Sequence, residues 1–213
     1  MKPLLLDLFC GAGGAAMGYS RAGFDVIGVD IEPQPHYPFR FIQADALTFP
    51  LEGFDAIHAS PPCQDHSALA TRAGLHGTGW MLAATRERLQ QQPRPWAIEN
   101  VNGAPLAAHF ILCGSMFGLT LGRWQLRRHR LFETSGWFGL TPPCAHNRPA
   151  LGVYGHGSSH PEGHPKGSKA SAALAREIMR IDWMTMAELG QAIPPAYTEY
   201  IGQQLMEALS LAA

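Results

Sequence analysis

The sequence lacks any apolar run long enough to cross a bilayer. Its first residues, 1–6, begin like a secretory signal, but Asp7 interrupts the run too early for the hydrophobic region of such a signal. The chain also lacks a C-x-x-C pair, and its four cysteines (10, 63, 113 and 144) are too sparse for a disulfide scaffold. These absences predict a cytoplasmic protein with reduced thiols and no membrane association.

Neither charge nor polarity dominates the composition. The 213 residues are 46% hydrophobic and 15% charged, with a net charge of −1, which predicts one globular domain with a sizeable core. The charge is segregated, because residues 121–180 hold nine Lys/Arg against three Asp/Glu, whereas residues 181–213 hold four acids and no Lys or Arg. A basic middle segment suits contact with a polyanion, although such a run is more often only a solvated face.

The N-terminal residues predict a strand, a glycine-rich turn, a helix and a second strand. The expected order is an apolar strand at 4–9, a tight turn at Cys10–Gly14, a helix at 15–22 closed by Gly23, and a strand at 24–29 ending at Asp30. Glycines allow close backbone approach, the helix start offers N–H donors, and Asp30 accepts from ribose hydroxyls. The turn has no Lys-Ser/Thr pair, which excludes a P-loop, and Glu32 disfavours a phosphorylated ribose. A nucleoside cofactor is therefore predicted.

Two further strands carry candidate site residues. A strand at 39–43 leads to Asp45, which is placed either to read an adenine amino group or simply to form a turn. Residues 54–59 read as a buried strand stopped by Pro61 and Pro62, which fix the backbone. Cys63 then follows at the carboxyl end of a strand, where open α/β sheets bind ligands. A lone cysteine is usually inert and buried. Other stretches of this chain, which predict a nucleoside site, a buried acid and a pair of arginines, favour a nucleophilic role for Cys63.

The middle of the chain supplies an acid and two arginines. A polar loop at 65–80, long enough to act as a lid, precedes an expected helix at 80–91. A strand at 96–101 surrounds Glu99 with apolar residues, so its carboxyl is expected to be buried with a raised pKa, the alternative being an exposed strand edge. After an expected helix and turn at 107–121, alternation over 126–132 predicts a strand with Arg128 and Arg130 on one face, able to clamp a phosphate or carboxylate.

The C-terminal third mixes an irregular segment with helices. Pro, Gly, His and Ser dominate residues 134–170, which we interpret as an insertion facing the substrate. Cys144-Ala145-His146 and the histidines at 156, 160 and 164 match none of the strong zinc patterns, so loop histidines are expected rather than a metal site. Helices are expected at 171–183, 186–189 and 196–211.

Taken together, these stretches resemble the DNA cytosine-5 methyltransferases. Five motifs occur in the family's order: Asp7–Gly14 for the cofactor, Ser60–Gln64 for the nucleophile, Glu99–Val101 for the acid, Arg128–Arg130 for the arginines, and Gly190–Pro195 near the C-terminus. The resemblance implies an α/β, Rossmann-like S-adenosylmethionine-dependent methyltransferase fold, with a mixed, mostly parallel sheet and helices on both faces. It also implies methylation of cytosine carbon 5 in DNA with S-adenosyl-L-methionine as cofactor.

The resemblance assigns a role to each motif. Cys63 would attack carbon 6 of a cytosine flipped out of the DNA stack, Glu99 would hold ring N3, and Arg128 and Arg130 would steady the base or a phosphate. The implied cofactor-binding residues are Phe9, Gly11, Gly13, Asp30, Ile31, Asp45, Pro62, Gln191 and Ala192. The implied substrate-binding residues are Gln64, Ser67, Asn100 and Val101.

The chain departs from the family pattern in four places. Ile31 replaces a frequent aromatic, Gln191 replaces the usual asparagine, and the glutamine that precedes the arginine pair comes one place early, as Gln125. Only about residues 134–175 occupy the place of a large target-recognition region. We therefore expect a catalytic core at 1–133, a short insertion at 134–175, and C-terminal helices at 176–213 that complete the core.

Several alternatives stay open at this point. The same chemistry could act on RNA, a separate partner could supply specificity, or the chain could be a non-catalytic nucleic-acid-binding relic; a cysteine enzyme using Cys63 and His66 ranks lowest. A restriction–modification system, a mobile element or a phage would each be a consistent setting.

Overall fold

The computed structural model describes residues 1–62, 79–107, 110–136, 141–153 and 170–212. Its strands are β1 (Leu4–Leu8), β2 (Asp25–Asp30), β3 (Arg40–Gln43), β4 (Ala56–Ala59), β5 (Trp96–Val101), β6 (Phe110–Leu112), β7 (Thr120–Leu121), β8 (Trp124–Leu126), β9 (Arg130–Thr134) and β10 (Ala150–Leu151). Its helices are α1 (Gly14–Ala22), α3 (Trp80–Gln90), the 3-10 turn η1 (Gly114–Phe117), α4 (Ala172–Met179), α5 (Met186–Gln191) and α6 (Pro195–Ala212).

Seven strands form one mixed sheet in the order β3-β2-β1-β4-β5-β9-β6. The first five pair in parallel, whereas β9 runs antiparallel to both β5 and β6. The chain moves outward from β1 to β2 and β3, and then returns to place β4 on the other side of β1. The loops after β1 and β4 therefore diverge at a topological switch point, which is where open α/β sheets bind ligands.

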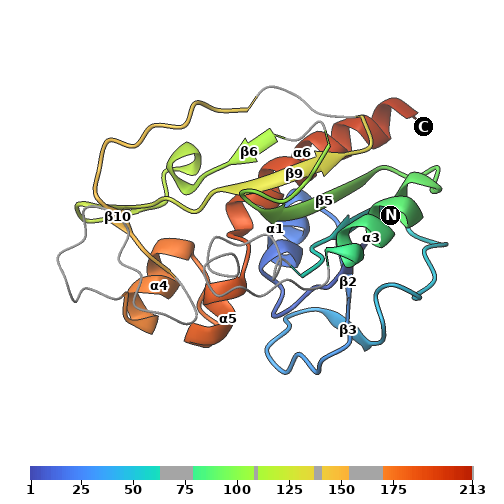
Figure 1. Cartoon of the computed structure of the whole chain (residues 1–213), viewed down its shortest axis with the longest axis horizontal. Coiled ribbons are helices and arrows are strands. Elements are labelled where there is room, and N and C mark those ends of the chain that lie inside the picture. The colour runs from blue at the N-terminus through green and yellow to red at the C-terminus, as the bar shows by residue number, and fades with distance from the viewer. Residues whose placement is uncertain (63–78, 108–109, 137–140, 154–169, 213) are drawn as a thin grey trace.

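Alternation along the strands divides the core between the two faces of the sheet. One face packs Leu5, Val26 and Ala56 against residues of α1, α4 and α6. The other face packs Leu6, Ile27 and Ile57 against α3, through Leu82 and Leu89. Helices thus cover both faces, and the predicted α/β class with a mixed, mostly parallel sheet is confirmed. Figure 1 shows α4 and α5 side by side, at the end of the molecule away from both termini.

Helices α1 and α6 lie against each other along a seam of small residues. A Cβ at Gly18 would lie 2.1 Å from Thr198 Oγ1, and one at Gly202 would lie 2.6 Å from Ala22 Cβ. The Thr198 hydroxyl donates to the Ala15 carbonyl at 2.8 Å. Because Gly18 and Gly202 contribute no side chain at these points, the two helices approach closely, and α6 fixes the position of α1, which begins directly after the glycine-rich turn.

Three expectations for the second half of the chain were wrong. Residues 126–132 do not form one strand: β8 pairs with β7 and β10 in a separate three-stranded sheet, and the chain crosses to the main sheet at 127–129 before β9 begins. Residues 110–121 form β6, η1 and β7 instead of a helix and turn. Helix α4 ends at Met179 rather than at 183, because Arg180 adopts a left-handed C-cap with φ 57°.

The other expected elements are confirmed within a few residues, including the cap of α1 at Gly23, whose N–H donates to Ser20 and Tyr19 carbonyls. The predicted boundaries of the insertion at 134–175 stay a prediction. Within the described residues, no helix combines the length and the hydropathy that crossing a membrane requires.

Candidate active site

The glycine-rich turn after β1 is tied to the end of β2 by Asp30. The Gly11 N–H donates to Asp30 Oδ2 at 3.0 Å, and the Glu32 N–H donates to Asp30 Oδ1 at 3.1 Å. The carboxylate of Asp30 therefore holds the turn in place with the same oxygens that were predicted to meet a ribose. Each carboxylate oxygen has a second lone pair, so holding the turn leaves room for a further donor.

The same turn has an unusual backbone. Phe9, Gly11 and Gly13 adopt positive φ values of 56°, 48° and 84°. For Phe9 this conformation is strained, and such strain concentrates at functional sites. A Cβ at Gly13 would lie 2.7 Å from Pro38 Cδ, whereas a Cβ at Gly11 would meet nothing within 4 Å. Gly11 therefore borders open space, as expected of a residue that a ligand approaches closely.

The C-terminal motif lies beside this turn. A Cβ at Gly14 would be 2.4 Å from the Ile193 carbonyl and 3.2 Å from Ala192 Cβ. The Trp183 indole N–H also donates to the Ala12 carbonyl at 2.8 Å. The structure thus brings Ala192, and with it the adjacent Gln191, to the turn from which they are separated by more than 170 residues in sequence.

The remaining predicted cofactor residues lie at the carboxyl ends of β2 and β3. Ile31 is 64% exposed, which is high for a large apolar side chain. Asp45 Oδ1 accepts from the Leu47 N–H at 2.8 Å, so this residue does form a turn. The turn supports the simpler interpretation of Asp45, and its contact with adenine stays a prediction.

The prolines that precede Cys63 are fixed by Asn100. The buried Asn100 amide donates from Nδ2 to the Pro61 carbonyl at 3.0 Å, while its Oδ1 accepts from the Val101 N–H at 2.9 Å. Asn100 thus links the end of β5 to the turn after β4. Cys63, Gln64, Ser67 and residues 65–78 of the lid predicted at 65–80 lie outside the described residues. The structure places only the turn that precedes them, up to Pro62.

Glu99 and Arg130 form a buried ion pair across β5 and β9. Arg130 Nε lies 2.8 Å from Glu99 Oε1, and the two side chains are only 14% and 8% exposed. Burial raises the pKa of Glu99, and the positive charges of Arg130 and then Arg128 oppose this increase. The expected burial and raised pKa of Glu99 are therefore confirmed. A carboxyl held in this balance can exchange its proton with a bound base.

A buried chain of polar groups, missed at the sequence level, leads to Glu99. Tyr19 Oη lies 3.0 Å from His58 Nδ1, and His58 Nε2 lies 2.8 Å from Ser60 Oγ, which hydrogen-bonds to Glu99. Burial lowers the pKa of His58 to about 3, so its ring is neutral at pH 7 and donates through one nitrogen only. If Tyr19 donates to Nδ1, then Nε2 donates to Ser60 and Ser60 donates to Glu99. The available signal was a histidine inside an apolar strand.

Asp7 is a second buried ionisable group that the site prediction omitted. The residue is completely buried in β1, and burial raises its pKa well above the usual range, with the nearby charge of Asp30 adding to the effect. The Ala16 backbone N–H opposes the increase in pKa only in part. A carboxyl within an apolar strand was again the signal in the sequence.

Arg128 points to a different partner from Arg130. Its guanidinium donates to the Val153 carbonyl at 2.8 Å and to the Gly190 carbonyl at 2.6 Å, and its own carbonyl accepts from Tyr197 Oη at 2.6 Å. Arg128 therefore joins the segment after β10 to α5, while its charge still acts on Glu99. The two arginines do not share a strand face as expected, because the chain changes sheets between them.

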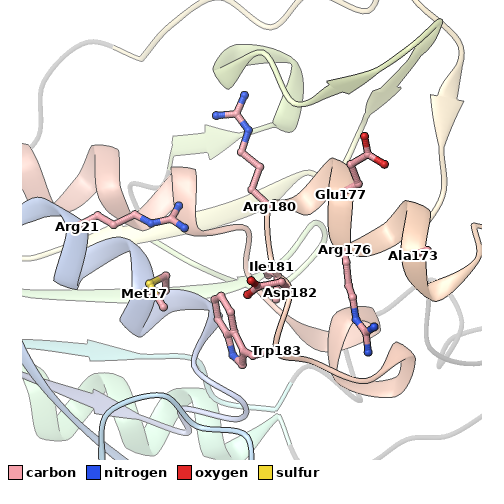
Figure 2. Close-up of a pocket in the computed structure, with 9 residues that line it drawn as sticks. All are labelled: Met17, Arg21, Ala173, Arg176, Glu177, Arg180, Ile181, Asp182 and Trp183. Carbon is pink, nitrogen blue, oxygen red and sulfur yellow. The ribbon is translucent and has the colours of Figure 1, made fainter.

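A separate pocket of about 550 Å³ lies between α1 and the end of α4. Figure 2 shows Arg176 and Arg180 extending in opposite directions from this end of α4, with Trp183 between them and α1. None of the residues predicted for the site is among its described lining residues. Two of its lining residues reach the glycine-rich turn: the Trp183 indole N–H donates to the Ala12 carbonyl, and the Met17 backbone N–H donates to the Gly13 carbonyl.

Comparison with known proteins identifies relatives that match about half of the chain. The Type II methyltransferase M.XorII of Xanthomonas oryzae is 27% identical over 128 residues, which cover 51% of this chain and 30% of that protein. The chain spans about a third of the length of the curated relatives it matches.

Solved structures share the fold over almost the whole chain. A proposed DNA modification methyltransferase encoded within an E. coli prophage and the S. pombe Dnmt2 methyltransferase both superpose with a TM-score of 0.64, at 15% and 13% identity, and each covers 98% of this chain and 99% of its own. These identities establish the fold alone. The family model of C-5 cytosine-specific DNA methylases matches residues 4–109, which contain the turn after β1, the Pro61–Pro62 turn and Glu99. The chain belongs to the C-5 cytosine-specific DNA methylase family.

Proposed function

We propose that this protein methylates carbon 5 of cytosine in DNA, with Cys63 as the nucleophile. The observation that carries the proposal is the buried Glu99–Arg130 pair, which lies beside the turn that precedes Cys63. Asn100 follows Glu99 on β5 and donates a hydrogen bond to the Pro61 carbonyl. The end of β5 therefore positions both the acid, Glu99, and the turn that precedes Cys63. Family membership and the names of the relatives, which are Type II methyltransferases, favour DNA as the substrate.

The residues after β1 and β2 fit S-adenosylmethionine. Gly11 borders open space that a Cβ would enter, the Asp30 carboxylate can accept from ribose hydroxyls, and the exposed Ile31 offers an apolar surface for an adenine ring. Phe9, Gly13, Pro62, Gln191 and Ala192 complete the proposed binding site, with Asp45 at its adenine end. S-Adenosylmethionine supplies an activated methyl group when it is bound.

The chain's own residues prepare the cytosine ring for this transfer. The Cys63 thiolate forms a bond to carbon 6 of cytosine. As negative charge develops toward N3, Glu99 donates a hydrogen bond or its proton to that nitrogen. Carbon 5 thereby becomes nucleophilic and accepts the methyl group. A water molecule then takes the proton from carbon 5, and the electron pair of that C–H bond forms the double bond between carbons 5 and 6. Cys63 leaves carbon 6 as a thiolate, and any proton that N3 accepted returns to Glu99. Each bond that Cys63 forms is broken again, so the enzyme is regenerated.

Arg130 and the polar chain through Ser60 set the state of Glu99 during this cycle. The guanidinium stabilises the carboxylate after Glu99 gives up its proton, and burial favours the return of that proton. Gln64, Ser67, Asn100 and Val101 are proposed to surround the flipped base. Arg128 is proposed to act through its hold on Gly190 next to Gln191, and its positive charge also faces Glu99.

Nucleoside mass spectrometry tests the proposal directly. The purified protein is incubated with S-adenosylmethionine and, separately, unmethylated DNA or RNA. We expect 5-methyldeoxycytidine in the DNA, lost in Cys63→Ala and reduced at least about 100-fold in Glu99→Gln. Glu87→Gln, an exposed carboxyl on α3, serves as the matched control and should keep full activity. 5-Methylcytidine in RNA alone would reassign the substrate, and no product in either nucleic acid would refute the enzymatic proposal.

A covalent trap tests the mechanism separately. The protein is incubated with S-adenosylmethionine and a DNA strand that contains 5-fluorocytosine. After methyl transfer, carbon 5 of this base carries fluorine and methyl and has no proton to lose, so the bond between carbon 6 and Cys63 should persist as a protein–DNA adduct. Peptide mapping should locate the adduct at Cys63, and Cys63→Ala should form none. An adduct at Cys10, Cys113 or Cys144 would contradict the assignment of the nucleophile.

A further inference from the structure

Two cysteines and two histidines gather outside the active site. Cys113 immediately precedes η1, His129 lies on the crossing between β8 and β9, and Cys144 and His146 belong to the segment at 141–149. The ligand atoms of all four side chains lie within 4.8 Å of one another. His146 Nε2 is 3.1 Å from Cys144 Sγ and 3.5 Å from Cys113 Sγ, and His129 Nε2 is 3.6 Å from Cys144 Sγ.

These distances match those around a tetrahedral zinc ion. With Zn–S near 2.3 Å and Zn–N near 2.0–2.1 Å, tetrahedral angles place a sulfur and a nitrogen ligand about 3.6 Å apart. Two of the three sulfur–nitrogen distances agree with this value within about 0.1 Å, and the third is shorter by about 0.5 Å. The ligand atoms also belong to two cysteines and two histidines, which is a common set for structural zinc.

A hydrogen-bonded cluster explains the arrangement less well. A neutral imidazole nitrogen either donates one N–H or accepts at one lone pair. His146 Nε2 approaches both sulfur atoms, so hydrogen bonding accounts for one of these contacts and leaves the other unexplained. A metal ion at the centre of the four groups accounts for both contacts at once.

The surroundings of the cluster suit thiolate ligands. The Ser115 hydroxyl lies 3.4 Å from both Cys113 Sγ and Cys144 Sγ, where it can donate to a sulfur that carries negative charge. Gln125 is buried, and it donates to the Ala145 carbonyl and accepts from the Arg148 N–H. The backbone on either side of His146 is therefore anchored to β8.

We propose that Cys113, His129, Cys144 and His146 bind one zinc ion as a structural site. Four protein ligands leave no open position for water, which distinguishes structural zinc from catalytic zinc. The segment at 141–149 forms no helix or strand, and most of its side chains are exposed, so apolar burial contributes little to its order. Zinc would hold it by joining it to η1 and to the crossing between the two sheets.

One ligand of the proposed ion, His129, is adjacent in sequence to both arginines of the candidate active site. His129 stands between Arg128 and Arg130, and Arg130 Nη1 donates to the His129 carbonyl at 3.1 Å. The zinc site would therefore fix the backbone at 127–130, from which Arg130 reaches Glu99. This proposal replaces the expectation of loop histidines without a metal, and it stands independently of the proposed methylation.

Metal analysis of the purified chain tests the site. We expect roughly one zinc per chain in the wild type and in Cys63→Ser, but loss of zinc in Cys144→Ser and His146→Ala. His146→Cys should retain zinc, because three cysteines and one histidine also form a zinc site, and this rescue separates ligand loss from misfolding. Cobalt substitution should give thiolate-to-cobalt charge-transfer bands and tetrahedral absorption that disappear in the same two variants.

Three results would overturn the proposal. One is a wild-type protein without zinc that fails to bind added Zn²⁺ under reducing conditions. Another is a Cys113–Cys144 disulfide found by mass spectrometry in protein that was kept reduced. The third is zinc that persists in both Cys144→Ser and His146→Ala, which would place the ion on other residues.

Discussion

Replacing Arg130 with methionine isolates the electrostatic support of Glu99. The substitution keeps much of the apolar stem and removes the guanidinium that lies 2.8 Å from Glu99 Oε1. Without this charge, the buried carboxylate of Glu99 loses its ion-pair partner, and its pKa rises further. Glu99 in the folded variant therefore keeps its proton to a higher pH than in the wild type, so the cost of the substitution depends on the pH.

The size of the effect follows from this proton uptake. In the unfolded chain, Glu99 has the ordinary glutamate pKa of 4.5 and is ionised above that pH. A folded state that keeps Glu99 protonated is destabilised by at most about 1.36 kcal/mol for each pH unit above 4.5. The free energy of unfolding therefore falls by at most about 3.4 kcal/mol at pH 7 and by about 0.7 kcal/mol at pH 5. A group whose folded pKa is raised destabilises the fold as the pH rises above its unfolded pKa. Because Arg130 opposes that rise in pKa, its removal should cost up to about 3 kcal/mol more at pH 7 than at pH 5.

Urea unfolding at pH 5 and pH 7 measures the difference. Glu99→Gln carries no titrating carboxyl, so Arg130→Met in that background should cost the same at both pH values. Arg123→Met removes an exposed guanidinium that lies over the Trp124 ring, and it should show no pH dependence. Equal destabilisation by Arg130→Met at pH 5 and pH 7 in the wild-type background would refute the electrostatic reasoning. Methylation by Arg130→Met should fall at least about 100-fold if the pair is catalytic.

Three further predictions follow from other contacts. Asn100→Ala frees the Pro61 carbonyl, so stability should fall by about 1–3 kcal/mol and the rate of Cys63 alkylation by iodoacetamide should change; an unchanged rate would argue against the anchor. Asp7→Asn removes a carboxyl with a raised pKa, so the wild type should lose stability relative to the variant as pH rises above about 4, and parallel pH–stability curves would contradict this. Gly18→Ala forces a methyl group against Thr198 and should lower stability by about 1–3 kcal/mol in urea unfolding, whereas an unchanged midpoint would show that the seam can open.

The first half of the fold was predictable because its signals are local. Glycines, a helix cap at Gly23 and two prolines mark where β1, α1, β2 and β4 begin and end, and periods of two and 3.6 residues separate strands from helices. The second half was harder to predict because its elements depend on distant partners. The crossing at 127–129 follows from the pairing of β8 with β7 and β10, and alternation at Leu126 and Phe132 gave no sign of it.

The candidate site was predictable where one motif carries one role. Glu99 is buried as its apolar neighbours on β5 indicated. The role of Arg128 was not apparent, because its carbonyl partners, Val153 and Gly190, lie 25 and 62 residues away. The cluster of cysteines and histidines was missed for the same reason, since only Cys144 and His146 are neighbours in sequence.

The close seam between α1 and α6 has a consequence for synthesis of the chain. Ala15 and Thr198, which are joined by a hydrogen bond, are 183 residues apart. At about 5–20 residues per second, α1 emerges from the ribosome roughly 10–40 s before the helix that covers it. During this time its glycine-lined face has no native partner, and the Ile193 carbonyl has not yet reached Gly14. We therefore expect cofactor binding to begin only when α6 has docked, so nascent chains stalled before residue 195 should neither bind the cofactor nor resist proteolysis at α1.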